Sequence, residues 1–430
     1  MKFLFKIFLI LIFVLIIKES KANTLMDSLS SAYLNNPKLN AERANMRAAK
    51  EIKRGSVSEF LPSVTISGYV SEQRNTKGQA GTTDSSFKPR ENSITIEQKI
   101  FQGGSGVANF LKQKHGESLG EFNLKKAEQE ILLSAAKAHT DLLLNKKNLS
   151  INLINIDLLE RQVETDQNRL EKGEISLTDL AQSESSLAGA QAALIAAQND
   201  LVTSKANFEK VIGKTPSENI KDIGKLNLNL PKSLASAYNI SNSENPNLQI
   251  AKLEFEQSKL DVIIAGSELS PSATLSYEIS EQDDFSSTVA ERTQQTVKAT
   301  ATWPLFAGGN NFFNLRKNKE LRNQKELLYQ DAKKQIQTDV ANAWSRYQSS
   351  RSLLESVRSQ VKAAEIANEG ITQEYESGGS RTTLEVIQSR SILLNSRIDL
   401  AKSERNFLIS QFNLLSSIGR LTATQLKLKQ

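Results

Sequence analysis

The sequence predicts an α+β membrane protein in which a tandem duplication has produced two long α-helical hairpins and four short β-strands. Three observations support this fold class. Nearly the whole chain after its N-terminal segment repeats itself in the same order. Two long runs without proline carry apolar residues every seven positions, which is typical of helices that pack as coiled coils. Four runs of about ten residues alternate apolar and polar side chains, which is typical of membrane barrel strands.

Composition excludes several classes of site. The 430-residue chain has no cysteine, two histidines (His115 and His139) and 6% aromatic residues. Without cysteine there are no disulfides, no thiolate metal sites and no cysteine-linked lipid anchor. The net charge of +6 is too small for its length to indicate a nucleic-acid-binding protein.

Residues 1–22 have the features of a secretion signal. Lys2 and Lys6 begin a segment whose apolar run, Ile7 to Ile17, is too short to span a bilayer as a helix. Small residues near Ala22 mark the expected cleavage site. We therefore expect a cleaved signal peptide, and the alternative is an uncleaved anchor.

Paired motifs divide the remaining chain into a first repeat, 23–225, a second repeat, 226–421, and a tail, 422–430. The motifs keep the same order in both repeats, and the pairs are Ser28–Tyr33 with Ser233–Tyr238, Asn36-Pro37 with Asn245-Pro246, Ile100–Gly104 with Leu305–Gly309, and Val211–Thr215 with Ser417–Leu421. Any one pair is weak, but the ordered set indicates a duplication.

Each repeat begins with a short helix and then a helix that starts at the Asn-Pro dipeptide, because proline is favoured in the first turn of a helix. These helices are expected over 37–60 and 246–268. Two strand-like runs follow in each repeat, at about 61–72 and 92–102, and at about 271–280 and 296–306.

The stretches that join the strands, 72–92 and 281–295, are polar and are expected to be exposed loops. Phe101, Trp303 and Phe306 at the strand ends fit an aromatic girdle at the membrane interface. Four strands cannot close a barrel, and an open sheet edge is not viable in lipid. Closure therefore requires several chains.

A long helix then extends over 105–172 in the first repeat and over 310–377 in the second. At 1.5 Å per residue, each would be roughly 100 Å long. Return helices are expected over 174–212 and 381–418, and the seven-residue spacing in all four helices predicts left-handed coiled-coil packing. A return helix and an Asn-Pro helix together have about the length of one long helix, so we expect them to stack end to end.

These motifs together resemble the TolC-type outer-membrane efflux protein family over roughly residues 24–425. The resemblance rests on the paired Asn-Pro starts, the Phe-x-Gly-Gly junctions, the turn Gly173–Asp179 and the segment Tyr375–Gln388. It implies a homotrimer with a 12-stranded β-barrel in the outer membrane and an α-helical tunnel across the periplasm. The implied barrel–tunnel junction is formed by Phe101, Gly103, Gly104, Phe306, Gly308 and Gly309.

The resemblance also implies a function and partners. The chain would be a passive exit duct in a tripartite efflux or type I secretion system, opened when a periplasmic adaptor protein and an inner-membrane transporter engage it. Nothing in the sequence distinguishes drugs, other small molecules or proteins as the substrate.

A gate at the hairpin tips is implied by the same resemblance. Its members are Thr178 and Asp179 on the first hairpin and Tyr375 and Arg381 on the second, and this chain has one residue more between the last two than the family pattern. The alternative is that Asp179 and Arg381 serve only as ordinary groups at helix ends.

A pore constriction is implied one turn further, at Glu385 and Gln388. Because only one of the two is acidic, a trimer would carry three charges there instead of six, and we expect weak cation binding. The alternative is that Glu385 faces a neighbouring helix. Arg381, four residues before Glu385 in the sequence, is also close enough to pair with it.

No catalytic constellation is visible, since the histidines are far apart and the carboxylates are spread along solvated helix faces. We expect no enzymatic activity, no cofactor, no metal and no nucleic-acid partner. A periplasmic adaptor would also use long hairpins, but it would flank a single hairpin with compact β domains. A fibrous coiled-coil surface protein would lack the paired strands.

Overall fold

The computed structural model describes residues 24–75, 85–217, 220, 228–286, 289–377 and 381–428. The expected signal peptide and the residues between the expected helices 310–377 and 381–418 lie outside the described residues. The chain forms two units. The first contains the chain up to Glu42, Lys125–Asn245 and the chain from Gln335 onward, and the second contains Arg43–Leu124 and Pro246–Lys334.

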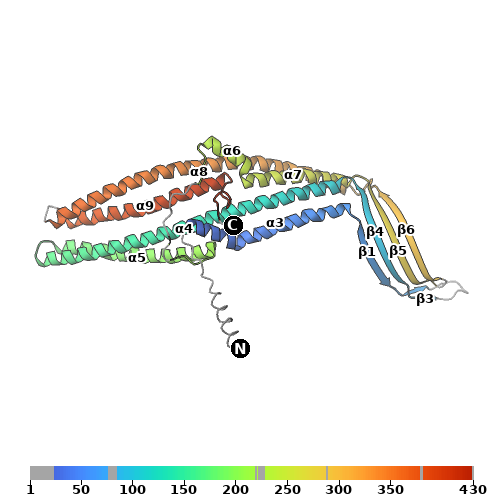
Figure 1. The fold of residues 1–430 in the computed structure, drawn as a ribbon, viewed down its shortest axis with the longest axis horizontal. Helices are drawn as coiled ribbons and strands as arrows, with labels where there is room; N and C mark the ends of the chain where they lie inside the picture. Colours follow the sequence, from blue (N-terminus) through green and yellow to red (C-terminus); the bar gives the residue numbers. More distant parts are fainter. Residues whose placement is uncertain are drawn as a thin grey trace, which may run out of the picture. The chain divides into compact units, whose positions relative to one another are not determined.

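Both halves of the chain supply the same kinds of element in the same order (Figure 1). The first half contains α2 (Leu25–Asn35), α3 (Pro37–Gly55), the 3₁₀ helix η1 (Ser56–Phe60), β1 (Ser63–Val70), β4 (Arg90–Gln102), α4 (Ser105–Glu171) and α5 (Leu177–Ile212). The second half contains α6 (Leu234–Glu244), α7 (Pro246–Ser267), β5 (Ser272–Ser286), β6 (Val289–Thr302), α8 (Asn310–Glu376) and α9 (Thr383–Ser417).

The four main strands form one antiparallel sheet in the order β1-β4-β5-β6. Strands β1 and β6 are therefore the edges of this sheet. Large apolar side chains on the strands point into open space, and Ile66 and Val297 are 77% and 73% exposed. Exposed apolar residues on a sheet with free edges are what a segment of a membrane barrel requires before neighbouring copies and lipid cover it.

The expectation that 281–295 is an exposed loop was wrong. Strand β5 continues to Ser286 and β6 begins at Val289. Pairing continues through polar residues, with Glu281 opposite Thr293 and Asp283 opposite Glu291. Backbone hydrogen bonds hold such a ladder without any apolar face, so the alternation that predicts a strand is missing where both faces are polar.

The stretch 72–92 also contains strands, although it was expected to be a loop. Strands β2 (Gln73–Asn75) and β3 (Ser85–Phe87) pair with each other, and β4 begins at Arg90. Both short strands are too polar and too brief to produce an alternating pattern in the sequence.

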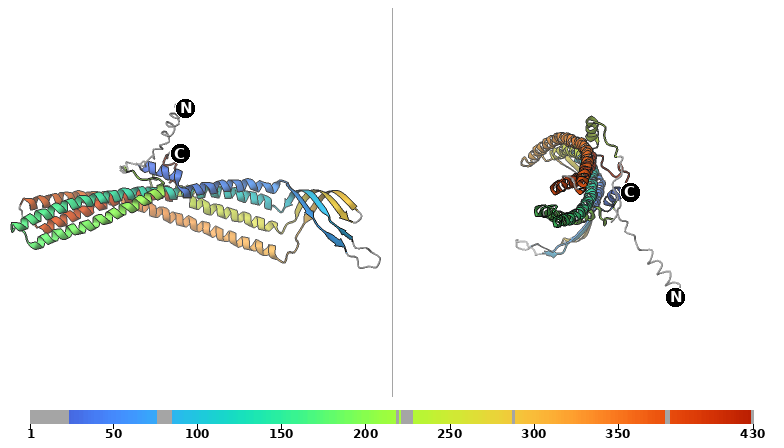
Figure 2. Two further views of the ribbon diagram at one scale, coloured as in Figure 1. Left: turned by 90° about the horizontal axis from the view of Figure 1, so that it is seen from below. Right: turned by 90° about the vertical axis from the view of Figure 1, so that its left-hand side faces the viewer.

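Within the first unit, α4 and α5 lie side by side as one hairpin, and α8 and α9 form the other (Figures 1 and 2). The residues that repeat every seven positions are all buried or half-buried here; they include Leu142, Val340, Val361, Phe208 and Leu414. Seven-residue spacing keeps one seam of each helix facing its partner, which explains why this burial persists over many turns.

Small side chains form a second seven-residue series on each return helix. The buried members are Ser183, Ala190, Ala197 and Ser204 on α5, and Ser389, Ser396, Ser403 and Ser410 on α9. Their hydroxyls bond across the hairpin, for example Asn368 Nδ2 to Ser389 Oγ at 2.9 Å and Ser350 Oγ with Ser410 Oγ at 2.8 Å. Small residues allow helix backbones to approach closely and leave room for polar groups on the facing helix.

Each Asn-Pro dipeptide contacts the last turn of a return helix through its asparagine and begins another helix with its proline. Asn36 Nδ2 donates to the carbonyl of Val211 at 3.1 Å, and its Oδ1 accepts from Lys38 N. In the second half, Asn245 Nδ2 donates to the carbonyl of Ser417 at 2.7 Å. The last-turn carbonyls of a helix lack partners within it, so each asparagine satisfies one carbonyl while its proline begins the next helix.

Candidate functional site at the hairpin tips

The two hairpin tips are built by the same local motif. Ser176 precedes α5 and accepts from the amide of Asp179, whose carboxylate accepts from the Ser176 amide at 3.0 Å. Thr382 precedes α9 and forms the same reciprocal pair with Glu385. Such capping boxes satisfy backbone amides that have no partner inside the helix, so both return helices start at a defined residue.

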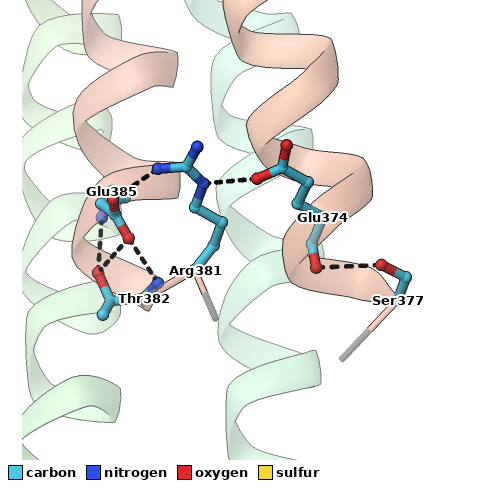
Figure 3. A network of polar contacts seen from close by, with 5 residues as sticks. All are labelled: Glu374, Ser377, Arg381, Thr382 and Glu385. Atoms are coloured by element: carbon cyan, nitrogen blue, oxygen red, sulfur yellow. Dashed lines mark hydrogen bonds and ion pairs between the residues drawn. The ribbon is translucent and has the colours of Figure 1, made fainter. Parts of the chain in front are cut away.

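A network of charged side chains crosses the tip of the second hairpin (Figure 3). The guanidinium of Arg381 donates through Nε to Glu374 at 2.6 Å and through Nη1 to Glu385 at 3.0 Å. Thus Arg381 joins the end of α8 to the start of α9. Arg381 therefore also pairs with Glu385, four residues away, within a single chain.

The capping bond and the arginine both act on the Glu385 carboxylate. The backbone amide of Thr382 lowers the pKa of Glu385 most strongly, and Arg381 lowers it further. The carboxylates of Glu374 and Glu385 raise the pKa of Arg381. Glu385 is therefore ionised at neutral pH but is already engaged with a cation, while Gln388 is exposed.

A buried carboxylate connects the two hairpins. Asp166 lies on α4 with no exposed surface. Its Oδ1 accepts from Tyr375 Oη of α8 at 2.9 Å and from Gln162 Nε2 at 2.8 Å, and its Oδ2 accepts from Ser183 Oγ of α5. Three helices thus converge on one carboxylate, and the bond to Tyr375 is the one that passes from the first hairpin to the second.

The aromatic ring of Tyr375 is enclosed from several sides. The side chain is 4% exposed, its hydroxyl also bonds Thr383 Oγ1 at 3.0 Å, and the Arg169 guanidinium lies 4.5 Å from the ring centroid. Burial raises the pKa of Tyr375 most strongly, so the phenol remains protonated and donates. A guanidinium over a tyrosine ring is an attractive cation–π contact.

Further contacts join α4 to α9 along the hairpins. Arg405 bonds Asp141 at 2.7 Å and Lys147 bonds Glu404 at 3.2 Å. Nearer the tip, Arg390 Nη1 donates to the carbonyl of Leu158 at 3.3 Å, and burial lowers the pKa of Arg390. The hairpins are therefore connected by ion pairs far from the tip. Close to the tip they are connected by the buried hydrogen bond between Asp166 and Tyr375.

In a single chain, the predicted gate residues differ in whether their hydrogen bonds stay within their own hairpin or reach the other one. Thr178 is exposed, and Asp179 bonds Ser176, whose hydroxyl lowers the pKa of Asp179 most strongly. Tyr375 does reach the first hairpin, but its partner there is Asp166. Arg381 bonds within its own hairpin. The assignment of these four residues to a gate, and of Glu385 and Gln388 to a constriction, stays a prediction.

Asp166 was not identified from the sequence, although a signal for it exists. It belongs to the seven-residue series of α4 that contains Ile131, Ala138, Asn145, Asn152 and Leu159. A carboxylate in such a seam must be paired or hydrogen-bonded, which marks it as a candidate for a specific polar contact.

The predicted junction residues lie where strand gives way to long helix. Gly103 has φ +59°, and a Cβ there would lie 2.7 Å from the Ser270 Cβ. Only glycine fits this backbone without a shift. Phe101 and Phe306 are 50% and 86% exposed, which leaves both rings free to contact another surface, and their role at a barrel–tunnel junction stays a prediction.

The described part of the chain lacks two other features, a metal-ligand cluster and a helix able to span a membrane. Within it, no group of three or more His, Cys, Asp and Glu side chains is arranged to hold a metal ion. None of the helices described combines the length and the apolarity needed to cross a membrane.

Comparisons with known proteins identify the family. The family profile described as "Outer membrane efflux protein" matches residues 28–214 and 237–420. The outer membrane efflux protein BepC of Brucella suis biovar 1 (strain 1330) is 26% identical over 409 residues, which cover 95% of this chain and 88% of BepC. The alkaline protease secretion protein AprF of Pseudomonas aeruginosa is 20% identical, with 97% of this chain and 89% of AprF covered.

Solved structures show the same fold. The CmeC outer membrane channel of Campylobacter jejuni superposes with a TM-score of 0.83 at 14% identity, over 93% of this chain and 86% of CmeC. The predicted fold class of duplicated hairpins with four strands per chain is confirmed. The resemblance and the outer-membrane location are also confirmed. The adaptor alternative is not supported. The chain belongs to the outer membrane efflux protein family.

Proposed function

We propose that the chain forms the exit duct of a tripartite efflux or type I secretion system, with its periplasmic end held closed by contacts between the hairpin tips. Family membership supports the role of an outer-membrane channel. The observation that carries the gating proposal is the buried bond between Asp166 and Tyr375, because it joins the two hairpins where they end. A periplasmic adaptor protein and an inner-membrane transporter are the proposed partners.

The two free sheet edges support a homotrimer. Inside the hydrocarbon region every backbone polar group needs a partner, so β1 of one copy must pair with β6 of the next. Three copies of four strands make the 12-stranded barrel implied by the resemblance. The exposed apolar residues of the strands would then face lipid.

We expect cysteine cross-linking to trap this trimer. The natural chain has no cysteine, so Thr65→Cys on β1 can be combined with single cysteines along 296–302 on β6 without background reaction. At the correct register, oxidation should produce a three-chain band on a denaturing gel. The same β6 cysteines combined with Gly370→Cys on α8 serve as a control and should stay monomeric. A cross-linked product limited to dimers in every register would contradict the closed ring.

The charged groups at the tip are expected to contribute to closure less than the buried group. The double variant Asp179→Ala, Arg381→Ala removes one capping carboxylate and the cation that joins Glu374 to Glu385. Exposed ion pairs are individually weak, so we expect a measurable but moderate rise in the resting conductance of the reconstituted channel. Unchanged conductance in this double variant would remove Asp179 and Arg381 from the gate.

A further inference from the structure

A histidine is fully buried on α4, under the short helix α2. Ser28 Oγ of α2 lies 2.8 Å from His139 Nδ1, and the imidazole ring is 6.1 Å from the ring of Phe208 on α5. His139 has no exposed surface. Its second nitrogen, Nε2, has no hydrogen-bond partner in the described structure. Such an unsatisfied buried atom is unusual in a folded protein and requires an explanation.

Helix α2 uses this histidine as one of its attachments to the first hairpin. Ser31 Oγ donates to the carbonyl of Ile212 at 3.1 Å, and Leu25, Leu29 and Ala32 are buried. Asn36, directly after α2, bonds the carbonyl of Val211. Helix α2 and Asn36 therefore connect α4, through His139, to the C-terminal end of α5. Helix α3 begins directly after Asn36.

The second half of the chain has no histidine at the matching position. The position 205 residues after His139 is Trp344, which packs 6.0 Å from the ring of Tyr347. There the end of α6 is held by a bidentate ion pair between Glu244 and Arg420, at 2.9 and 2.6 Å. Arg420 lowers the pKa of Glu244 most strongly, so this pair persists into mildly acidic conditions.

The charged groups around His139 do not favour an imidazolium ion enough to offset its burial. Asp27 of α2 is the carboxylate that raises the pKa of His139, but burial has the larger effect and lowers that pKa to about 4. On α4, Asp141 is paired with Arg405 of α9. On α5, Glu209 and Lys210 next to Phe208 are exposed.

We propose that His139 makes the docking of α2 acid-sensitive, so that protonation of its imidazole releases α2 from the first hairpin while α6 stays docked in the second half. In the doubly protonated imidazolium, Nδ1–H can donate to Ser28 Oγ, but Nε2–H has no acceptor in the described structure. The two halves of the duplicated chain would thus respond differently to acid.

Proton linkage gives the direction in which pH changes the docking of α2. The pKa is lower in the docked state than the ordinary 6.5 expected when α2 is released, so acid favours release. Stabilisation of docking is complete above about pH 6.5 and is lost progressively down to about pH 4. Because of this difference in the pKa of His139, lowering the pH from 7 to 5 increases the population of the released state by about 20-fold.

Hydrogen exchange measured on the intact purified protein in detergent tests this proposal. Protection factors of amides in Leu25–Asn35 are compared at pH 7 and pH 5, with Leu234–Glu244 as the internal reference. We expect protection in α2 to fall by about 20-fold, and protection in α6 to change by less than about twofold.

Two variants identify His139 as the responsible group. His139→Trp introduces the residue of the second half, and His139→Asn places an amide near the position of Nδ1 without a group that titrates. Either variant, once folded, should remove the extra loss of protection at pH 5. An equal loss in α2 and α6, or the same loss in either variant as in the natural protein, would overturn the proposal.

Discussion

Replacement of Asp166 by alanine is expected to raise the resting conductance of the reconstituted channel by at least tenfold. The change removes the buried acceptor of Tyr375, Ser183 and Gln162 at once. Buried hydrogen bonds to a charged group contribute about 1.5–3 kcal/mol each, and about 1.4 kcal/mol changes an equilibrium tenfold. The loss of the inter-hairpin bond alone therefore shifts the balance between closed and open tips by about this factor.

A series of variants separates the bond between hairpins from the contacts inside one hairpin. Tyr375→Phe removes only the hydroxyl that crosses from α8 to α4, whereas Ser183→Ala removes a bond inside the first hairpin. We expect conductance to rise in the first variant and to stay near the natural value in the second. Glu164→Ala, at an exposed position of α4 two residues before Asp166, controls for general effects of substitution.

Planar-bilayer recordings at fixed voltage provide the measurement, and thermal melting by circular dichroism confirms that each variant is folded. If Asp166→Ala and Tyr375→Phe both conduct like the natural protein while melting normally, the bond between Asp166 and Tyr375 has no part in closure. The gate would then have to be sought in contacts between different copies.

Replacement of Gly419 by alanine is expected to destabilise the first unit by about 3 kcal/mol or more. Gly419 follows α9 with φ +86°, and a Cβ there would lie 2.3 Å from the carbonyl oxygen of Glu244 and 2.7 Å from the amide nitrogen of Asn245. Both neighbours are backbone atoms, so no side chain can move aside. The shift would also disturb the bond of Asn245 to Ser417 and the ion pair of Glu244 with Arg420.

Two other glycines provide matched controls for this variant. Gly213 occupies the corresponding site in the first half with φ +73°, but the nearest atom to its added Cβ is Asn35 Cβ at 3.7 Å. Gly213→Ala should therefore show only the cost of the left-handed backbone, about 1–2 kcal/mol. Gly370 lies inside α8 with nothing within 4 Å of an added Cβ, so Gly370→Ala should be neutral or stabilising by up to about 1 kcal/mol.

Melting temperatures of the purified protein in detergent rank the three variants. The expected order of stability is Gly370→Ala at or above the natural protein, then Gly213→Ala, then Gly419→Ala. A melting temperature for Gly419→Ala equal to that of Gly213→Ala would show that the backbone around Glu244 yields, and that the close approach costs little.

The long helices could be predicted because their signals are repetitive. A seven-residue apolar spacing that continues for many turns has one structural solution, and the observed bounds Ser105–Glu171 and Asn310–Glu376 lie within one residue of the expected 105–172 and 310–377. The sheet was less predictable. Beyond the apolar band its strands are paired through polar residues such as Glu281 and Asp283, and the hydrogen bonds of a ladder leave no pattern in side-chain type.

The tip contacts were the least accessible to sequence reasoning. Asp179 in the first turn of a helix is equally compatible with a cap and with a longer-range link, and in a single chain it forms the cap. The choice between Asp166 on α4 and Asp179 on α5 as the partner of Tyr375 depends on how these two helices are placed against α8. A linear sequence states that both carboxylates exist but not which one lies opposite the tyrosine.

The measurement that tests the central claim most directly is planar-bilayer conductance of the purified mature protein, with its mass in the same detergent determined in parallel. A trimer that gives small, mostly closed conductance steps is the result expected for a tunnel closed at its hairpin tips. A monomer that does not conduct would contradict the proposal that this chain, with three copies closing one barrel, forms an exit duct.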